Sequence, residues 1–303
     1  MDWITGMQKA IDYIEAHLDD EIDYDRVAKE SLSSSYHFQR VFGILCGYTL
    51  GEYIRNRRLT LAGAELASDR ATVIDVALKY GYDSPDSFAK AFRAFHGITP
   101  SQARGNGSML RSFSRLSIHV SLEGGNMMDY RIESGQPMTL LGYKRRFAGV
   151  PHGKQREDQE HDMFISTRAS QWMLMGLTND RTTDICVVTG VGDDGYDFYI
   201  AARIGAYELE HLYDPEVTGI DFMERFDFEV LTIPAVTYAV FETPKQRYPT
   251  ADYMDIRRRI AAEWLPGSGY RLADAPELSM YHWRPVGGKQ DRSIEIWVPV
   301  VKE

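Results

Sequence analysis

The sequence contains little cysteine. Only two cysteines occur among 303 residues, Cys46 and Cys186, and each lies in an apolar context. This excludes a disulfide-based scaffold and predicts two buried free thiols, as in a reducing cytosol. No Cys/His cluster has the spacing of a zinc site. We therefore expect no metal and no other cofactor.

Long hydrophobic runs are also absent. No apolar run reaches the roughly 18 residues that a membrane-spanning helix needs. The N-terminal sequence MDWITGMQKA has no basic region followed by an apolar stretch, so no signal peptide is expected. With 44% hydrophobic and 26% charged residues, the composition is that of a globular protein. We expect a cytoplasmic protein with two domains, each with its own hydrophobic core.

The sequence has no excess of basic residues. The formal net charge is −10, with 12 basic and 15 acidic residues in 1–105 and 22 and 29 in 106–303. Because neither part is basic overall, indiscriminate nucleic-acid binding is disfavoured. Any nucleic-acid binding must therefore use a local basic face.

The first hundred residues contain an internal repeat. Apolar, basic, glycine and threonine positions recur about 50 residues later in the same order. The matching pairs are Val27/Val76, Ala28/Ala77, Phe38/Phe88, Arg40/Lys90, Phe42/Phe92, Gly47/Gly97 and Thr49/Thr99. The spacing predicts two copies of a helix–turn–helix unit.

Helix-end signals agree with this repeat. Ser33 is expected to cap the helix of SSSYHFQRVF, and Ser84 to cap its counterpart. Pro85 suits the first helical position because its missing N–H has no partner there anyway. The remaining signals are two capping boxes and one helix stop, at Thr72, Thr99 and Gly81.

The segment between the two copies, Leu50–Asp69, predicts one long helix without proline. About 20 residues at 1.5 Å per residue span roughly 30 Å. Successive major grooves on one face of B-DNA lie roughly 34 Å apart. A stiff helix of this length therefore allows one chain to place two recognition helices in adjacent grooves.

The polar faces of these helices favour DNA binding over a merely solvated surface. Gln39 and Arg40, beside His37, are expected to be exposed, and glutamine and arginine make bidentate contacts to base edges. The second helix offers residues better suited to phosphate or mixed contacts, and the connecting helix offers an arginine cluster. These residues are Ser87, Lys90 and Arg93, and Arg55, Arg57 and Arg58.

Residues 5–104 resemble the AraC/XylS DNA-binding domain. The resemblance lies in VAKESLSSSYHFQRVFGILCGYTLGEYIRNRRL and IDVALKYGYDSPDSFAKAFRAFHGITPSQAR. It implies two helix–turn–helix units on a linker helix that bind promoter DNA. On the family pattern, the recognition helices fall on Ser34–Leu45 and Pro85–Phe95.

A Gly/Ser-rich region separates this part from the rest of the chain. GNGSML and LEGGN flank RLSIHVSL, which is predicted as an edge strand over Arg115–Leu122. We therefore expect an all-α domain over 1–107, a linker over 108–125 and a second domain over 126–303.

A second repeat predicts the fold of residues 126–303. Tyr196–Ile204 resembles Ile294–Val301 at an offset of 98 residues. Strands are also expected from Thr139 and Thr232, each followed by a helical pattern. These helical patterns are His161–Gly176 and Tyr253–Trp264. Two strand–helix–strand–strand halves predict one antiparallel sheet with helices on one face, an α+β domain.

Strand alternation places Glu295 and Trp297 together on the face without helices, and likewise Asp197 and Tyr199. A carboxylate two residues before an aromatic residue, in both halves, is typical of a pocket for a cation. A solvated Glu295 beside a Trp297 that covers the sheet is equally compatible with the pattern. Further candidate walls are Tyr143, Trp172, Tyr238 and Trp264.

Residues 126–303 also resemble the GyrI-like ligand-binding domain. The resemblance lies in MMDYRIESGQPMTLLGYKRRFAG, FEVLTIPAVTYAVFETP and DRSIEIWVPVV. It implies a pseudo-twofold sheet with a central cleft, a key acidic residue that maps to Glu295, and amphipathic, often cationic, ligands. The order of the two domains is similar to that of Rob-type regulators.

Together these features predict a transcription regulator that binds promoter DNA and a small-molecule effector, with RNA polymerase as a further partner. One alternative is a hydrolase in which Glu295 acts as general acid or base. The other is a module that binds a protein partner. No nucleophile–base arrangement is recognisable in the sequence, so no catalytic residue is predicted.

Overall fold

The computed structural model describes residues 3–68, 71–104, 108–118, 127–178, 183–212, 219, 221–285 and 288–302. The chain divides into two compact units, residues 1–39 with 48–123 and residues 40–47 with 124–303. We call the first the helical domain and the second the sheet domain.

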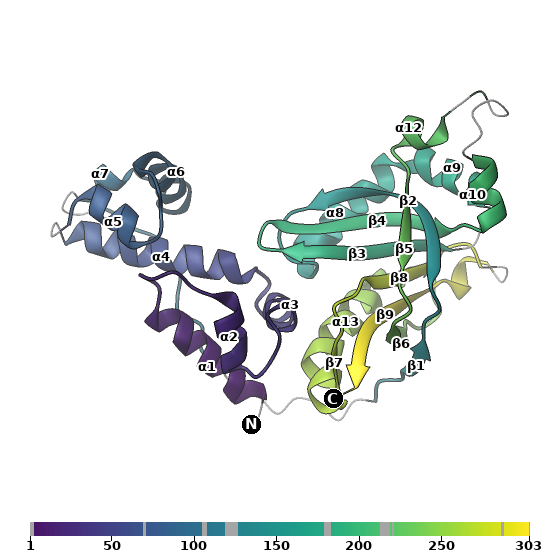
Figure 1. Cartoon of the computed structure of the whole chain (residues 1–303), viewed down its shortest axis with the longest axis horizontal. Coiled ribbons are helices and arrows are strands. Elements are labelled where there is room, and N and C mark those ends of the chain that lie inside the picture. The colour runs from purple at the N-terminus through teal and green to yellow at the C-terminus, as the bar shows by residue number, and fades with distance from the viewer. Residues whose placement is uncertain are drawn as a thin grey trace. The chain divides into compact units, whose positions relative to one another are not determined.

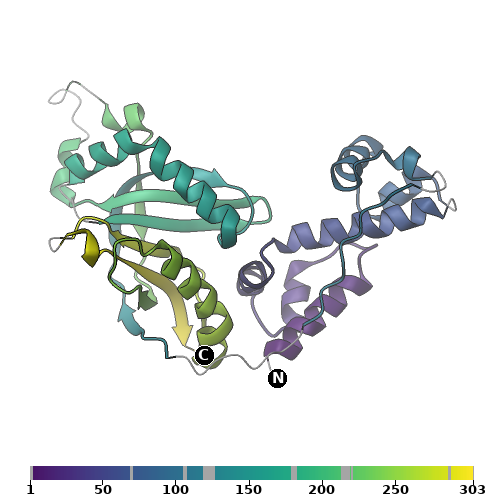
Figure 2. The ribbon, with the colours of Figure 1, turned by 180° about the vertical axis from the view of Figure 1, so that it is seen from behind.

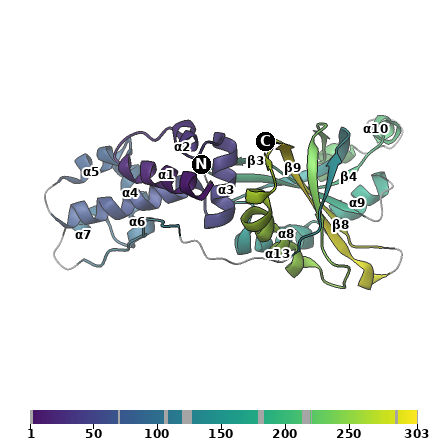
Figure 3. The same ribbon diagram turned by 90° about the horizontal axis from the view of Figure 1, so that it is seen from below.

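The N-terminal part of the chain is built around one long helix, α4. It has 18 residues and so a length of about 27 Å. The helices α1 to α3 lie toward one end of α4 and α5 to α7 toward the other (Figure 1, Figure 3). The helices are α1 (Trp3–Ala16), α2 (Tyr24–Glu30), α3 (Ser35–Cys46), α4 (Leu50–Ala67), α5 (Val73–Lys79), α6 (Pro85–His96) and α7 (Pro100–Ala103). The predicted linker helix is present and ends two residues earlier than expected.

Most predicted helix ends are found. Ser84 accepts a hydrogen bond from the N–H of Ser87 at the start of α6, with Pro85 in the first turn. Thr99 and Gln102 form a complete capping box at α7. At Thr72 one half of the predicted capping box is seen, since its hydroxyl oxygen accepts from the Asp75 N–H. The predicted helix stop is also found, since Gly81 adopts φ +79°.

The start of α3 differs from the expectation. Ser34, not Ser33, accepts a hydrogen bond from the His37 N–H, at 3.2 Å. Ser33 instead forms a hydroxyl–hydroxyl hydrogen bond with Ser31, at 2.8 Å. Three consecutive serines make the cap position ambiguous in the sequence, because any of them can supply the hydroxyl.

The edge strand predicted over Arg115–Leu122 is not found at residues 115–118, and its remaining residues, 119–122, lie outside the described residues. Residues 108–118 instead run in an extended conformation along α4 (Figure 2). The Phe113 N–H donates to Thr60 Oγ1 at 2.9 Å, and the Leu116 N–H donates to Tyr53 Oη at 3.1 Å. Side chains of α4, rather than a neighbouring strand, therefore satisfy these backbone donors.

The described strands of the sheet domain form one nine-stranded antiparallel sheet. Its order is β1-β6-β9-β8-β3-β4-β2-β5, and β7 pairs with β9. The strands are β1 (Arg131–Ser134), β2 (Met138–Phe147), β3 (Asp184–Gly192), β4 (Gly195–Arg203), β5 (Glu229–Ile233), β6 (Thr237–Glu242), β7 (Tyr270–Leu272), β8 (Glu277–His282) and β9 (Ser293–Lys302).

Two equivalent halves build this sheet, as predicted. The first is β2, α8 and α9, β3 and β4; the second is β6, α13, β8 and β9. Antiparallel pairing of β3 with β8 joins the halves, with Cys186 opposite Ser279 near the middle of the register. The helices of this domain are α8 (Gly153–Ser166), α9 (Arg168–Thr178), α10 (Ala206–Leu212), α12 (Phe222–Phe226) and α13 (Thr250–Arg259), the last continued by a π-helical turn (Ile260–Trp264).

The two faces of the sheet differ in what covers them. The helices α8 and α13 lie over the same face (Figure 2). On the other face, side chains from both ends of the strand order share one core, which includes Leu140, Ile233, Tyr238, Val240 and Trp297. This face is therefore filled by packed side chains and is not an open platform.

One predicted strand is interrupted. The sequence TIPAVTYAVF reads as a single strand from Thr232, yet β5 ends at Ile233 and β6 begins at Thr237. Pro234 lies in the break, and proline cannot donate to a strand ladder. The break allows β5 and β6 to pair at different ends of the sheet.

Candidate functional site

A groove on the helical domain lies between α4 and α6. It has a volume of about 540 Å³, and its lining includes Arg55 and Asn56 of α4 and Ser87 and Lys90 of α6. Arg55 and Lys90 are exposed. The structure thus brings together three of the predicted DNA contacts. Arg93 is exposed on the same helix but is not part of the groove lining.

The other two arginines of the predicted phosphate cluster hold the domain together instead. Arg57 donates to both carboxylate oxygens of Glu15 at 2.8 Å and to the Phe113 carbonyl at 2.6 Å. Arg58 donates to the Leu18 carbonyl at 2.8 Å. Helical spacing could not separate these arginines from Arg55, because their partners come from distant parts of the chain.

On α3, the three predicted base-reading residues differ in exposure. Gln39 is partly exposed, and its side-chain amide donates to Ser35 Oγ at 3.1 Å. His37 and Arg40 are 8% and 3% exposed, whereas an exposed face was expected for both. Hydrophobic periodicity identifies the apolar stripe of a helix, but it does not exclude burial of polar side chains beside that stripe. Base reading by these residues remains a prediction.

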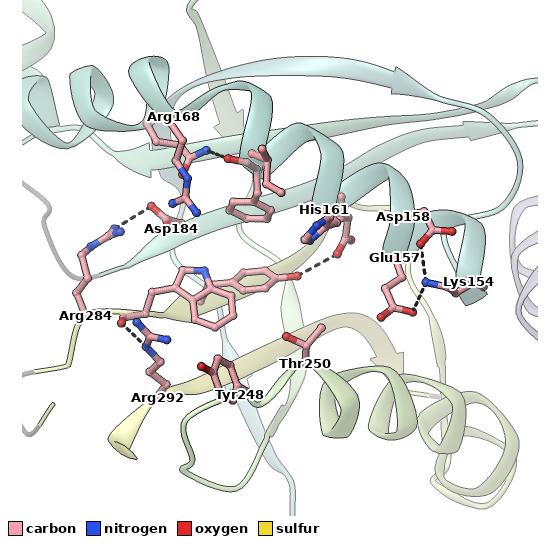
Figure 4. Close-up of a pocket in the computed structure, with 16 residues that line it drawn as sticks. Lys154, Glu157, Asp158, His161, Arg168, Asp184, Tyr248, Thr250, Arg284 and Arg292 are labelled. Atoms are coloured by element: carbon pink, nitrogen blue, oxygen red, sulfur yellow. Dashed lines mark hydrogen bonds and ion pairs between the residues drawn. The ribbon is translucent and has the colours of Figure 1, made fainter. Parts of the chain in front are cut away.

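A cavity of about 870 Å³ opens on the helix-covered side of the sheet domain (Figure 4). Phe164 of α8 and Tyr281 of β8 contribute to its lining, together with Trp283 after β8 and Tyr248 before α13. Both halves of the domain therefore contribute to the walls. The cavity lies at the junction that the β3–β8 pairing creates.

Aromatic rings form the apolar part of this cavity. The rings of Tyr281 and Trp283 are 5.3 Å apart between centroids, and those of Phe164 and Tyr281 are 5.5 Å apart. The guanidinium carbon of Arg292 lies 5.7 Å from the Trp283 ring. Such a wall binds flat apolar groups and fixes the position of the neighbouring guanidinium.

A buried polar network supports one wall of the cavity. Arg156, which is fully buried, donates to Glu160 of the lining and to Tyr253 Oη, the latter at 2.8 Å. Tyr281 Oη also donates to Glu160, at 3.2 Å. Burial alone would lower the pKa of Arg156, but the Glu160 carboxylate holds that pKa well above its usual value. Arg156 is therefore charged and Glu160 is already engaged.

The predicted cation site at Glu295 is occupied by the chain's own residues. Arg131 of β1 forms an ion pair with Glu295 at 2.8 Å, and its guanidinium carbon lies 5.9 Å from the Trp297 ring. Trp297 Nε1 donates to Glu295 at 2.8 Å. The sequence pattern predicted a pocket for a cationic ligand here, and in the structure the cation beside the carboxylate and the aromatic ring is Arg131.

The equivalent carboxylate and aromatic residue in the first half, Asp197 and Tyr199, also lie beside basic residues of the chain. Asp197 pairs with Arg146 at 3.3 Å, and the Lys144 ammonium lies 5.5 Å from the Tyr199 ring. Basic residues of β1 and β2 complement the two pairs, so each carboxylate already has a cationic partner within the chain. The hydrolase alternative, in which Glu295 is the acid or base, loses its structural basis for the same reason.

The remaining predicted wall residues lie elsewhere. Tyr143 is buried, and its hydroxyl forms a hydrogen bond with that of Thr167 at 2.7 Å. Tyr238 is also buried and donates to the Pro276 carbonyl, whereas Trp172 is 68% exposed. Among the described residues that line the 870 Å³ cavity, none is a residue predicted for ligand binding.

The sequence analysis missed Phe164, Tyr281, Trp283 and Arg292. A usable signal was present in YHWRP, where two aromatic residues flank a histidine at the end of a strand and an arginine follows. The carboxylate–aromatic pattern of the strands favoured the face without helices. The wall from α8 was not recognisable because periodicity does not show which helix residues face a cleft.

Two classes of feature are not seen in the part of the chain that the structure describes. There, no group of three or more His, Cys, Asp or Glu residues is placed to hold a metal ion. No described helix is both long and apolar enough to cross a membrane.

Comparison with known families agrees with the two-domain architecture. A family model described as "Helix-turn-helix domain" matches residues 27–106. A second, described as "Integron-associated effector binding protein", matches residues 221–300. The first covers both predicted helix–turn–helix units, and the second covers most of the second half of the sheet domain.

Curated relatives establish the family. The transcriptional activator AarP of Providencia stuartii is 47% identical over 92 residues, which are 30% of this chain and 68% of AarP. The regulatory protein SoxS of Salmonella typhimurium is 41% identical over 98 residues, 32% of this chain and 92% of SoxS. The chain belongs to the AraC family of transcription regulators. This family consists of DNA-binding regulators and not of enzymes, and the chain combines its DNA-binding domain with a GyrI-like effector-binding domain in the Rob-type order.

Among solved structures, SAV2435 bound to tetraphenylphosphonium resembles the chain with a TM-score of 0.42 and 17% identity. The match covers 57% of this chain and 94% of SAV2435. The helix–turn–helix match makes DNA the partner of the N-terminal part of the chain, and the family model that matches residues 221–300 is described as effector binding.

Proposed function

We propose that this regulator recognises a specific promoter sequence as a monomer, with α3 and α6 in successive major grooves. The observation that carries this proposal is the 18-residue helix α4, whose length of about 27 Å is close to the groove repeat of roughly 34 Å. Arg55, Ser87 and Lys90, which share the α4–α6 groove, form the contacts of the second unit. Gln39 contributes to the first.

The DNA-binding proposal is tested by selection from a random duplex library at near-physiological salt. We expect a site with two short blocks about one helical turn apart. Lys90→Ala should weaken binding about uniformly across sequences and reduce the salt slope by about 1 for a phosphate contact, or cost about 5- to 150-fold at one position for a base contact of roughly 1–3 kcal/mol. Arg258→Ala is a matched control, because it removes one exposed positive charge on α13 of the sheet domain.

The effector-sensing proposal places a small amphipathic molecule in the 870 Å³ cavity. The aromatic wall of Phe164, Tyr281 and Trp283 supports it, since such rings bind apolar bodies. For this binding to regulate, the effector must have different affinities for two states of the protein. RNA polymerase is the partner through which a DNA-bound regulator of this kind changes transcription.

A candidate effector should therefore change affinity for the selected duplex, and Trp283→Ala should abolish that change without altering DNA binding in its absence. Transcription from the selected promoter with purified RNA polymerase gives the second readout. Binding of effectors that never alters DNA affinity or transcription would contradict the sensing role while leaving the DNA-binding role intact.

A further inference from the structure

The charges of the 870 Å³ cavity are unevenly distributed. Arg168, Arg284 and Arg292 lie at one end, near Asp184, whereas Lys154 lies at the other end with two carboxylates (Figure 4). Three guanidinium groups therefore accompany one carboxylate at the first end. Because the cavity walls exclude part of the solvent, this imbalance creates a positive potential there.

The carboxylate at this arginine end is already engaged. Asp184, whose side chain is 6% exposed, pairs with Arg284 at 2.9 Å. Within the described ranges, neither Arg168 nor Arg292 has a carboxylate within ion-pair distance. The positive charges of Arg168 and Arg292 thus remain without an acidic partner in the cavity.

The carboxylates at the other end are also engaged. Lys154 lies 2.5 Å from Asp158 and 3.6 Å from Glu157. Glu160, the acidic residue of the wall, binds buried Arg156 and accepts from Tyr281. A cationic ligand would have to compete with these internal partners, whereas an anion at the arginine end would not displace any.

Arg292 is held in a position suited to an incoming anion. Its Nε donates to the Trp283 carbonyl at 2.8 Å and one terminal nitrogen donates to the Arg247 carbonyl at 3.4 Å. Its guanidinium carbon lies 5.7 Å from the Trp283 ring. The group is therefore fixed beside the aromatic wall, which reduces the entropy lost on binding.

We infer that the effector of this regulator is a lipophilic anion, with its apolar body against Tyr281 and Trp283 and its negative charge at the Arg168–Arg284–Arg292 end. The inference rests on the effector-sensing role proposed above and adds the chemical class. It reverses the sign of charge expected from the sequence, where Glu295 indicated a cation. A hydrophobic carboxylate or sulfonate has the required chemistry.

The sign of the charge is tested with two probes of the same shape, tetraphenylborate and tetraphenylphosphonium. Binding of each to the full-length protein is measured by isothermal titration calorimetry at low and moderate salt. We expect tetraphenylborate to bind at least about tenfold more tightly, the scale of one partly exposed charge-assisted contact. The preference should shrink as salt rises.

Arginine substitutions test whether the preference for an anionic probe arises at this end of the cavity. Arg168→Gln and Arg292→Gln should each weaken tetraphenylborate several-fold and leave tetraphenylphosphonium unchanged or tighter. Arg203→Gln, an exposed charge on β4 outside the cavity lining, is the control and should change neither. Circular dichroism melts of the variants show that the fold is retained.

Three results would overturn the inference. These are tighter binding of tetraphenylphosphonium, equal binding of both probes with no effect of the arginine variants, and binding of neither probe. None of them bears on DNA recognition. A tighter phosphonium would leave the sensing role standing, because only the charge of the effector would then be wrong.

Discussion

Arg156→Met is predicted to destabilise the sheet domain more than any surface change on the same helix. The Arg156 side chain is fully buried, and Glu160 is 7% exposed. Glu277 keeps its ion pair with Arg257, so Glu160 is the carboxylate that loses its cation. Removing one partner of a buried ion pair typically costs about 3–5 kcal/mol, because the remaining charge stays buried without compensation. This corresponds to roughly a hundred- to several-thousand-fold loss in the folding equilibrium constant.

Urea unfolding measures this loss. Four of the five tryptophans, Trp172, Trp264, Trp283 and Trp297, lie in the sheet domain, so tryptophan fluorescence reports mainly on that domain. Lys154→Met, two residues earlier on α8 at an exposed position, is the control and should leave the urea midpoint unchanged.

A double variant separates lost charge pairing from lost packing. Adding Glu160→Gln to Arg156→Met removes the uncompensated charge and should recover most of the loss. An Arg156→Met variant within about 1 kcal/mol of the parent would refute the reasoning, since it would mean that Glu160 finds water or another cation at little cost.

Three further predictions concern the helical domain. Burial alone would raise the pKa of Glu15, but the Arg57 guanidinium holds that pKa below its usual value. The stability that this carboxylate contributes is therefore fully present above about pH 4.3 and is lost as the pH falls further. Glu15→Gln should accordingly flatten the acid limb of a stability-versus-pH curve, and an unchanged limb would contradict the assignment. Thr99→Ala should cost about 1 kcal/mol by removing a capping box, measured by thermal unfolding, with no shift if the cap is dispensable. Phe113→Ala should speed proteolysis within residues 108–118, because that segment loses its contacts with α4; an equal cleavage rate would show that the docking is weak.

The sequence was sufficient to predict the elements with strong local signals. The helix–turn–helix repeat, the linker helix and the caps at Ser84 and Thr99 depend on spacing and on hydroxyl side chains near helix starts. The two-half sheet followed from the resemblance between Tyr196–Ile204 and Ile294–Val301. In these cases neighbours along the chain determine the structure.

Features that depend on distant partners were not predictable. Whether Arg57 contacts phosphate or Glu15 depends on how α1 packs on α4. Whether Glu295 is open to a ligand depends on Arg131, which lies 164 residues earlier. Alternation placed Glu295 and Trp297 on the correct face, but it could not show that the same face is filled by side chains from both ends of the sheet.

The cavity itself was missed for a related reason. Its lining includes α8, the end of β8 and the segment before α13, which no single periodic pattern links. The pairing of β3 with β8 joins the two halves of the domain that carry them.

The central claim is that one chain reads two successive grooves with a spacing fixed by α4. The most direct test is affinity for the selected duplex before and after insertion of five base pairs between its two blocks. Half a helical turn moves the second block to the opposite face of the DNA, so we predict a loss of at least about a hundredfold. Equal affinity for both duplexes would contradict the claim, because it would mean that only one helix–turn–helix unit reads the sequence.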